Sequence, residues 1–478
     1  MDRLQPEFKD EIRRIVGDEN LKDGEAIATV DHGVAPENLG AGAVVYPRTT
    51  DEVAAVVKCC LANGISLVTQ GGRTGLVGGA MSRPGELVLS TARLNRILDI
   101  SPIERVAVVE AGVTLQALQV AAAEHRLETG IDLPSRGSAT IGGMASTNAG
   151  GIAAFRFGVM RHRILGLEAV LADGSIYSDL TRVVKNAAGY DLKHLFVGAE
   201  GTLGIITRIA VKLEPQPFAT ATVLFGLPSV DAALETVRRG LDAEYGQLRA
   251  AEAIWNTYFR LTSGHHRWSV SDYNAEHPVN LLVSLSGAEE GALQSELGRI
   301  YEDVIEDHPD ASAVIASSGA QEMDLWRLRE DTDLIYRKHP SAPSYDVSVP
   351  LSQVGSYLNR CLADLRGLDA TFDPYVFGHL ADGNLHIVLN AAGSDIAGEK
   401  AKAIEKVLYR DIVTIGGSFS AEHGIGTKRV GSLSATSNPV KLALMHRVKD
   451  TLDASAILNP GKVLPRQPTL RRRVHATR

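Results

Sequence analysis

The chain has 478 residues, of which 49 are Lys or Arg and 57 are Asp or Glu, and its formal net charge is −8. This balance argues against a dedicated nucleic-acid-binding protein, which carries a broad excess of Lys and Arg. The three cysteines are too few for a disulfide framework, and no uncharged apolar run reaches the ~18 residues needed to cross a bilayer. We therefore predict a cytoplasmic protein of several domains without an integral membrane segment.

The first half of the chain alternates short apolar strands with helices. Residues 43–70 are typical of a strand, a helix and a second strand, with Asp51 as the helix cap and Gly64 at its end. More strands are predicted at 86–91, 106–112, 166–174 and 204–215. A helix that Thr114 would cap is predicted at 114–128. Two prolines in the run 214–217 stop any regular element, so we expect a domain boundary there.

A different pattern follows this boundary. Strands and helices alternate at 219–229 (strand), 230–245 (helix), 280–288 (strand) and 291–307 (helix). This order predicts an antiparallel sheet with helices on one face, the α+β architecture. A last helix is predicted over 442–453, before a turn-forming Asn-Pro-Gly sequence.

Two glycine-rich segments suggest a ligand. The first, TQGGRTGLVGG at 69–79, directly follows a predicted strand, and the second, SRGSATIGGM at 135–144, runs on to NAGG at 148–151. Glycines leave backbone N–H groups uncovered, and successive uncovered amides form a concave site for phosphate. No G-x-G-x-x-G motif follows a strand, and no P-loop is present. The residues alone therefore indicate a phosphate-bearing cofactor held by glycine loops, the alternative being flexible surface loops.

Two histidine-containing motifs lie in the last third of the chain, GHLADGNLH at 378–386 and SAEHGIG at 420–426. The separation of His379 and His386 is not a helical spacing, and the Asp-Gly pair between them implies a turn. Both imidazoles could then meet, and a glutamate from elsewhere would complete a two-histidine, one-carboxylate set. Such a set suits a divalent transition metal with open positions for substrate. The alternative is a pair of buried histidines satisfied by backbone hydrogen bonds.

Four motifs in this order resemble the FAD-binding domain of the vanillyl-alcohol-oxidase type of flavoproteins: QGGRTGLVGGA, LPSRGSATIGGMASTNAGG, KNAAGYDLKHLFVGAEGTLGIIT and a terminal NPGK. Within that group the chain looks like the D-2-hydroxyacid dehydrogenases over about residues 40–465. The resemblance implies an α+β fold with a two-subdomain FAD-binding domain at 1–215. An antiparallel-sheet substrate (cap) domain would follow at 216–430, and a C-terminal helical segment at 431–478 would return to the FAD domain.

The resemblance also implies which residues contact FAD. In that family the glycine loops and the segment that corresponds to 198–207 enclose the cofactor. The matching residues are Gly71, Gly72, Arg73, Thr74, Gly75, Gly79, Pro134, Gly137, Ser138, Ile141, Gly142, Gly143, Ser146, Asn148, Gly150, Glu200, Gly201, Gly204, Ile206 and Asn459. Some relatives tether the flavin through a histidine near the position of Arg73. Arginine cannot act as that nucleophile, although its charge can neutralise phosphate, so we expect noncovalent FAD.

Roles in catalysis follow from the same resemblance. His379, His386 and Glu422 match the family's metal ligands, usually for zinc or manganese. His423 matches its catalytic histidine, and Arg329 matches the arginine that pairs with a substrate carboxylate. Together they imply FAD-dependent oxidation of a D-2-hydroxy acid to the 2-oxo acid, with hydride passing from C2 to flavin N5. The metal would act as a Lewis acid on the hydroxyl group, and the histidine would accept its proton.

The sequence departs from the D-2-hydroxyglutarate enzymes at three positions. Those enzymes typically carry threonine, lysine and asparagine where this chain has Asp333, Ser344 and Val388. Losing a cation and gaining a carboxylate should weaken the hold on a second substrate carboxylate. D-lactate-type members commonly have a serine at the position of Ser344. The expected substrate is therefore a small D-2-hydroxy acid, either D-lactate-like or D-2-hydroxyglutarate-like.

Several electron acceptors are compatible with the sequence, namely a quinone, an electron-transfer flavoprotein, a cytochrome or oxygen. A homodimer is a family expectation. The alternative function is a metallohydrolase built on His379, His386 and Glu422. A purified flavoprotein is yellow, whereas a metallohydrolase without flavin would be colourless.

Overall fold

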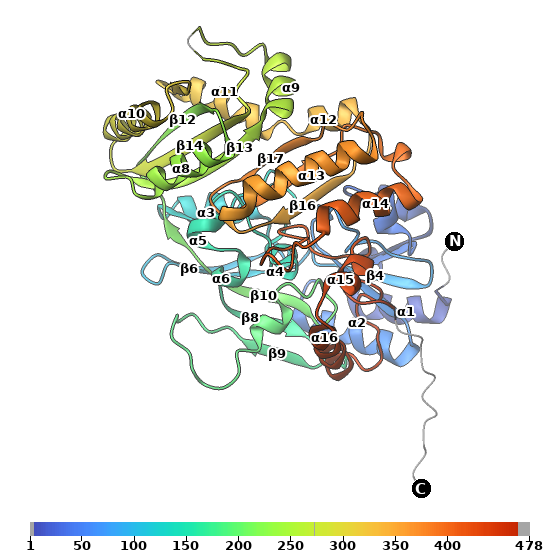
Figure 1. The fold of residues 1–478 in the computed structure, drawn as a ribbon. Coiled ribbons are helices and arrows are strands. Elements are labelled where there is room, and N and C mark those ends of the chain that lie inside the picture. Colours follow the sequence, from blue (N-terminus) through green and yellow to red (C-terminus); the bar gives the residue numbers. More distant parts are fainter. Residues whose placement is uncertain (1–3, 272, 467–478) are drawn as a thin grey trace. The chain divides into compact units, whose positions relative to one another are not determined.

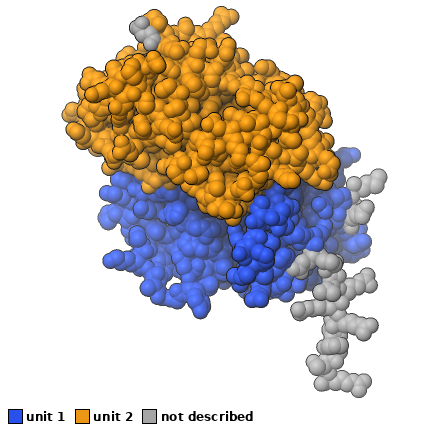
Figure 2. Space-filling view, in the orientation of Figure 1, with its two compact units in different colours: residues 1–151, 157–215, 422–478 blue, residues 152–156, 216–421 orange. Residues whose placement is uncertain are grey.

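The computed structural model describes residues 4–271 and 273–466. The chain forms two compact units, which Figure 2 shows in different colours. Unit 1 comprises residues 1–151, 157–215 and 422–478, and unit 2 comprises residues 152–156 and 216–421. The long segment of unit 2 thus begins at 216, and the chain returns to unit 1 at 422. The predicted domain limits at 215 and 430 stay predictions.

Unit 1 contains a four-stranded sheet in the order β1-β2-β4-β3. Its strands are β1 (Leu21–Asp23), β2 (Ala43–Val45), β3 (Ser66–Gln70) and β4 (Glu86–Ser90). The strands β2, β4 and β3 run parallel, which requires a crossover connection, and α2 (Thr50–Asn63) supplies it between β2 and β3. The predicted strand, helix and strand at 43–70 are confirmed.

The start of α2 differs from the prediction. Thr49, not Asp51, caps the helix, because the Thr49 hydroxyl accepts a hydrogen bond from the Glu52 backbone N–H at 3.1 Å. Asp51 lies inside the first turn, where a carboxylate is favourable but is no cap. Gly64 ends the helix as predicted, with a left-handed φ of 65°.

A second sheet of unit 1 is antiparallel, in the order β5-β6-β10-β8-β9. Its strands are β5 (Ile97–Ser101), β6 (Val106–Glu110), β8 (Ile164–Val170), β9 (Ile176–Asp179) and β10 (Ile205–Lys212). The helix α3 (Leu115–Ala123), which Thr114 caps as predicted, is shorter than the expected 114–128. It stops because Arg126 takes a φ of 58° and the next two residues form β7 (Leu127–Glu128), paired with β11 (Glu214–Pro215).

Unit 2 is built on a seven-stranded sheet in the order β15-β12-β14-β13-β17-β18-β16, with every pair antiparallel. The strands are β12 (Ala219–Leu227), β13 (Gln247–Trp255), β14 (Val279–Gly287), β15 (Ser312–Ile315), β16 (Ser344–Ser348), β17 (Tyr375–His379) and β18 (Asn384–Val388). The predicted antiparallel sheet of the second domain is confirmed.

Helices cover both faces of this sheet, so the expectation of one covered face is wrong (Figure 1). The ring of Phe225 on β12 lies 6.3 Å from that of Tyr301 on α10 (Glu290–Asp307). The next side chain on the same strand, Leu224, points to the other face and packs with α9 (Asn256–His266) and α11 (Gly319–Glu330). The continuous apolar run of β12 required cover on both sides.

Further helices belong to each unit. In unit 2, α8 (Val230–Leu241) and α13 (Val354–Leu368) lie on the α10 side, and α12 (Asp333–Lys338) follows α11. In unit 1, α15 (Val430–Thr436) and α16 (Pro439–Leu452) confirm the predicted C-terminal helix. Within the described residues, no helix combines the length and the apolar character that crossing a membrane requires.

Candidate active site

The two glycine-rich segments of unit 1 form the walls of one pocket. The first follows β3, and the second leads into α4 (Ile141–Thr147), whose cap Thr140 accepts a hydrogen bond from the Gly143 N–H at 3.2 Å. A Cβ atom at Gly72 would collide with the carbonyl oxygen of Ser138, so only glycine lets the two segments approach this closely. The pocket has about 960 Å³ of empty volume, its open mouth included, and unit 1 alone lines it.

Most residues that the family resemblance assigned to FAD line this pocket. They are Gly71, Gly72, Arg73, Thr74, Gly75, Gly79, Gly142, Gly143, Ser146, Glu200, Gly201, Gly204, Ile206 and Asn459. The predicted catalytic histidine, His423, lines the same pocket. Outside the lining are Pro134, Gly137, Ser138, Ile141, Asn148 and Gly150, whose contacts with FAD stay predictions. Ile141 belongs to the hydrophobic core, and Asn148 ends α4 with a φ of 54°.

The pocket also contains residues that the sequence analysis did not single out. These are Thr69, Gln70, Val77, Ala80, Thr91, Leu133, Ala139, Thr140, Met144, Thr147, Ala149 and Ile205. Nearly all of them stand beside or within the glycine-rich motifs, and this proximity was the only signal in the sequence. Thr91 had no such signal, and it reaches the pocket because its N–H donates to the Gln70 carbonyl oxygen at 2.9 Å.

Glu200 and Asn459 hold the walls of the pocket together. The carboxylate of Glu200 accepts hydrogen bonds from the backbone N–H groups of Ile425 and Gly426, at 2.7 and 2.8 Å. Burial raises the pKa of Glu200, and these two amides oppose that effect only in part. The Asn459 Nδ2 donates to the carbonyl oxygens of Glu200 and Gly79, at 2.6 and 3.2 Å. Both side chains therefore fix backbone around the predicted catalytic histidine.

Two polar atoms in the pocket fit a polar cofactor. Arg73, with a left-handed φ of 55°, donates from Nε to the Gln70 Oε1 at 2.6 Å and from Nη1 to the Asp31 carbonyl oxygen at 2.9 Å. Its Nη2 and the Oδ1 of Asn459 are buried without a hydrogen-bond partner among the described residues. A buried donor and a buried acceptor left unpaired are costly, so a bound group that pairs with them is expected.

A buried carboxylate organises the candidate site of unit 2. Glu252, on β13, is 0% exposed. Its Oε1 lies 2.6 Å from the Nδ1 of His379, and its Oε2 lies 2.8 Å from the Nε of Arg329. Burial alone would raise the pKa of Glu252, but the neighbouring His379 and Arg329 outweigh burial and lower it. Arg329, in the last turn of α11, also stacks on Phe377 at 4.7 Å.

The two predicted histidine ligands lie side by side in the hairpin of β17 and β18. The Asp-Gly turn between these strands is confirmed, with Gly383 at a φ of 73°. The rings of His379 and His386 are perpendicular, with centroids 5.5 Å apart, and their ligand nitrogens lie within 4.8 Å of one another. Asp346, across the strand pair from His386, is fully buried. Glu422 belongs to unit 1, and its role as the third ligand stays a prediction.

The three positions that differ from the D-2-hydroxyglutarate enzymes lie in unit 2. Ser344 on β16 and Val388 on β18 are direct cross-strand neighbours, on the sheet face that also carries His386. Val388 is buried, and Ser344 is half-buried near Tyr336, whose pKa burial raises. Asp333 is exposed in the first turn of α12. The structure thus brings two of these positions together beside the histidine hairpin.

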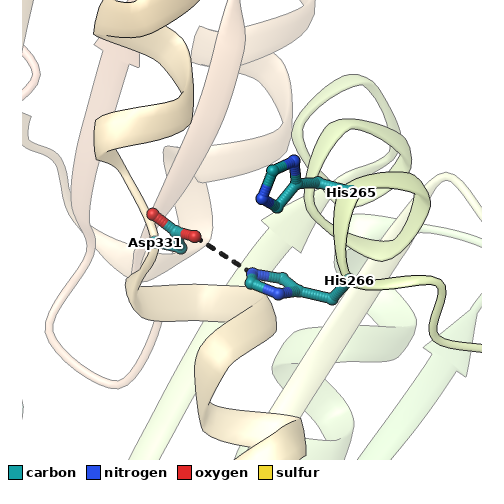
Figure 3. Close-up of side chains that lie close together, drawn as sticks. All are labelled: His265, His266 and Asp331. Carbon is teal, nitrogen blue, oxygen red and sulfur yellow. Dashed lines mark ion pairs between the residues drawn. The ribbon is translucent and has the colours of Figure 1, made fainter.

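A second group of metal-ligating side chains, unforeseen from the sequence, lies at the ends of α9 and α11 (Figure 3). It consists of His265, His266 and Asp331, whose ligand atoms lie within 4.8 Å of one another. The Nε2 of His266 is 3.1 Å from a carboxylate oxygen of Asp331, and both histidines are exposed. This pair ties the end of α11 to α9.

Comparison with protein families identifies the chain. Residues 216–463 match the family model described as "FAD linked oxidases, C-terminal domain", which covers more than half of the chain. Residues 41–199, which contain both glycine-rich segments, match the model described as "FAD binding domain". The chain belongs to the FAD-linked oxidases. FAD is therefore the cofactor of this FAD-linked oxidase, and the resemblance deduced from four sequence motifs is confirmed.

Individual relatives of this FAD-linked oxidase cover most of its length. A D-2-hydroxyglutarate dehydrogenase of Xanthomonas citri pv. viticola is 36% identical, over 88% of this chain and 89% of the relative. A mitochondrial D-2-hydroxyglutarate dehydrogenase of Bos taurus is 35% identical, over 88% of this chain and 76% of the relative. The structure of a 4-ethylphenol oxidase from Gulosibacter chungangensis superposes with a TM-score of 0.74, at 20% identity, over 98% and 99% of the two chains. This likeness confirms the predicted vanillyl-alcohol-oxidase fold.

Proposed function

We propose that this FAD-linked oxidase is a dehydrogenase that converts a small D-2-hydroxy acid to the 2-oxo acid. The observation that carries the proposal is the cluster in unit 2, where Glu252 lies between His379 and Arg329. This cluster offers a buried guanidinium for a substrate carboxylate beside a pair of imidazoles for a metal ion. The names of two curated relatives, both D-2-hydroxyglutarate dehydrogenases, support the same reaction class.

In this proposal the pocket of unit 1 binds FAD without a covalent tether. The glycine-rich segments supply backbone N–H groups for the diphosphate, and the unpaired Arg73 Nη2 supplies a charged donor. Arg73 stands where some relatives carry the tethering histidine, and arginine forms no such bond. Bound FAD supplies the hydride acceptor for the reaction.

Substitution of Gly72 should release the cofactor. In Gly72→Ala the new Cβ would collide with the Ser138 carbonyl oxygen, so the two glycine-rich segments must separate. Gly431→Ala is the matched control, because Gly431 lies in α15 with nothing within 4 Å of its Cβ position. We expect the FAD-to-protein absorbance ratio of purified Gly72→Ala to fall strongly and that of Gly431→Ala to stay unchanged. Full FAD content in both variants would contradict the assignment of this pocket.

The metal, zinc or manganese, would be held by His379, His386 and Glu422. The donor set fits, because the ligand nitrogens of His379 and His386 lie within 4.8 Å of one another, and Glu252 engages the Nδ1 of His379, so that the ion would bind through Nε2. A divalent ion there supplies Lewis-acid polarisation of the substrate oxygens. Two imidazoles and one carboxylate leave open positions for those oxygens.

The chain's own residues bind the substrate and move its proton. Arg329 is buried, and Glu252 and Phe377 hold its guanidinium in one orientation for pairing with the substrate carboxylate. His423, which lines the flavin pocket, is the proposed acceptor of the hydroxyl proton. Orientation by the arginine and proton removal by the histidine would prepare C2 for hydride loss.

The substrate preference should depend on Ser344. D-2-hydroxy acids with neutral side chains are expected to compete well with D-2-hydroxyglutarate, because no lysine stands at this position for a second carboxylate. Ser344→Lys should shift kcat/KM toward the diacid by about 1–3 kcal/mol, roughly five- to 150-fold. Ser356→Lys, which adds the same charge to an exposed position of α13, is the control. A wild-type enzyme that strongly prefers the diacid would contradict the role of Ser344.

A panel of D- and L-2-hydroxy acids with an artificial dye acceptor tests the proposed reaction. We expect turnover with D-enantiomers and formation of 2-oxo acids. Turnover with L-enantiomers alone, or with none of the acids, would refute the proposal. The physiological acceptor (a quinone, an electron-transfer flavoprotein or a cytochrome), the homodimer and the cytoplasmic location stay predictions; the bovine relative is named as mitochondrial.

A further inference from the structure

Glu252 is a buried carboxylate to which neither the sequence motifs nor the family comparison assigns a role. It lies on β13, directly opposite His379 on β17 in the antiparallel register. Each of its oxygens contacts a different residue of the proposed site, Oε1 the Nδ1 of His379 and Oε2 the Nε of Arg329.

We propose that Glu252 is a positioning residue, which fixes the metal ligand His379 and the substrate-binding Arg329 from one carboxylate. The proposal rests on the proposed function and deepens it, because it links the proposed metal ligand to the proposed carboxylate-binding arginine. Neither Glu252 oxygen is exposed to solvent, so the carboxylate acts through its two partners rather than on the substrate.

The contact with Glu252 determines which ring nitrogen of His379 carries the hydrogen. A carboxylate accepts hydrogen bonds and donates none, so the 2.6 Å contact places the hydrogen of His379 on Nδ1. The Nε2 then carries the lone pair that a metal ion requires. A carboxylate behind a ligating imidazole also fixes the ring plane and raises its basicity. Because Glu252 and His379 are register partners, the sheet itself fixes the separation of the two residues.

The contact with Arg329 selects which edge of the guanidinium is available. Glu252 occupies the Nε edge, and the face of Phe377 lies 4.7 Å from the central carbon. Among the described residues, no acceptor pairs with the two terminal nitrogens of this guanidinium. These nitrogens form the fork that binds a carboxylate through two parallel hydrogen bonds.

The backbone that carries Arg329 is anchored independently of Glu252. The hydroxyl of Tyr258 on α9 donates to the Arg329 carbonyl oxygen at 3.1 Å. Two residues further on, Asp331 pairs with His266 of α9, as Figure 3 shows. Removing the Glu252 charge should therefore disturb the guanidinium and the imidazole while α11 stays in place.

Only glutamate can both accept the hydrogen bond of His379 and form the ion pair with Arg329 at this position. Glutamine has the same shape, but its amide offers one acceptor oxygen and turns an N–H₂ donor toward the other partner, which is also a donor. Either His379 then loses its hydrogen-bond acceptor or the Arg329 guanidinium faces the amide, and in both cases Arg329 loses the negative charge of its ion pair, which is costly for a buried cation. Aspartate keeps the charge but is one methylene shorter, so it cannot reach both partners across the fixed sheet spacing.

The tautomer of His379 is the first test, and it uses the wild-type enzyme. The FAD-loaded enzyme, freed of metal by chelation, is labelled with ¹⁵N-histidine, and the His379 signals are identified by their loss in His379→Ala. We expect long-range ¹H–¹⁵N spectra to show the hydrogen on Nδ1. A hydrogen on Nε2 would overturn the proposal. This result depends neither on metal binding nor on the folding of a Glu252 variant.

Variants at Glu252 are the second test. In Glu252→Gln we expect zinc affinity, measured by competition with a chromophoric chelator, to fall by about 10–100-fold. The substrate KM should rise and the FAD content should stay at the wild-type level. The matched control is Glu296→Gln, since Glu296 is a nearly buried glutamate of α10 that pairs with Arg299 at 2.7 Å, and it should leave all three quantities unchanged.

The two tests separate this proposal from the proposed function. A Glu252→Gln enzyme that retains FAD and binds both zinc and substrate as tightly as wild type would overturn the positioning role. If His379→Ala instead binds zinc as well as wild type does, the proposed metal site is wrong. In that case the His379 tautomer and the substrate KM of Glu252→Gln still decide whether Glu252 positions the two side chains.

Discussion

Replacing His423 by asparagine should slow the reduction of FAD by D-2-hydroxy acid about 10²–10⁴-fold, the usual contribution of a general base. Asparagine keeps the approximate size of the side chain but accepts no proton. His423 lines the glycine-walled pocket of unit 1, so the loss should appear in the step that reduces the flavin. The measurement is the fading of flavin absorbance in a single anaerobic turnover, because this readout excludes reoxidation.

His125→Asn is the control for this prediction. His125 is an exposed histidine of unit 1 that follows α3, and its replacement should leave the reduction rate unchanged. FAD content should be equal in wild type and both variants, because Glu200 and Asn459 hold the pocket walls. A His423→Asn enzyme that reduces its flavin as fast as wild type would assign the base to another group.

Removing the metal should abolish most turnover without releasing FAD. A Lewis acid on the substrate oxygens contributes several kcal/mol, so His379→Ala, Glu422→Gln or chelation should each lower kcat/KM by about 10²-fold or more. FAD should remain bound, because unit 1 alone lines its pocket. Added zinc or manganese should restore the chelated wild-type enzyme but neither variant. Steady-state turnover and elemental analysis of the same samples provide the measurement.

The second histidine group supplies the control for the metal. His265→Ala removes an imidazole from the exposed cluster at the ends of α9 and α11, and it should change turnover little. Full turnover in wild type after exhaustive chelation, with the absence of metal confirmed, would refute a catalytic metal. If His265→Ala loses turnover and His379→Ala does not, the essential ion is bound by the exposed cluster of α9 and α11 rather than by His379.

The glycine-walled pocket could be predicted from the sequence because its signals are local. Glycines after a strand and a helix cap such as Thr140 depend only on neighbouring residues, so their structural effect does not depend on the rest of the fold. The more distant contribution of Asn459 was predictable only through the family resemblance. The buried Nη2 of Arg73, which has no hydrogen-bond partner among the described residues, was not predictable, because its position depends on the φ of 55° at that residue.

Glu252 shows where the sequence analysis failed. The sequence pattern predicts no strand at the position of β13, although one glutamate in the apolar run AAEAIW is a signal of a buried charge. Its partner His379 is 127 residues away along the chain, and the two meet only because β13 pairs with β17. A local sequence pattern does not determine the order of strands in a sheet. The expectation of helices on one face was wrong for the same reason, because the covering of a sheet also depends on residues far apart in the chain.

The most direct measurement is anaerobic titration of the purified enzyme with single enantiomers of 2-hydroxy acids. Flavin absorbance near ~450 nm is followed while the 2-oxo acid formed is quantified. We predict that D-2-hydroxy acids bleach the flavin and yield one 2-oxo acid for each FAD reduced, whereas their L-enantiomers leave the spectrum unchanged. A flavin that stays oxidised with every D-2-hydroxy acid tested would contradict the proposed dehydrogenase activity.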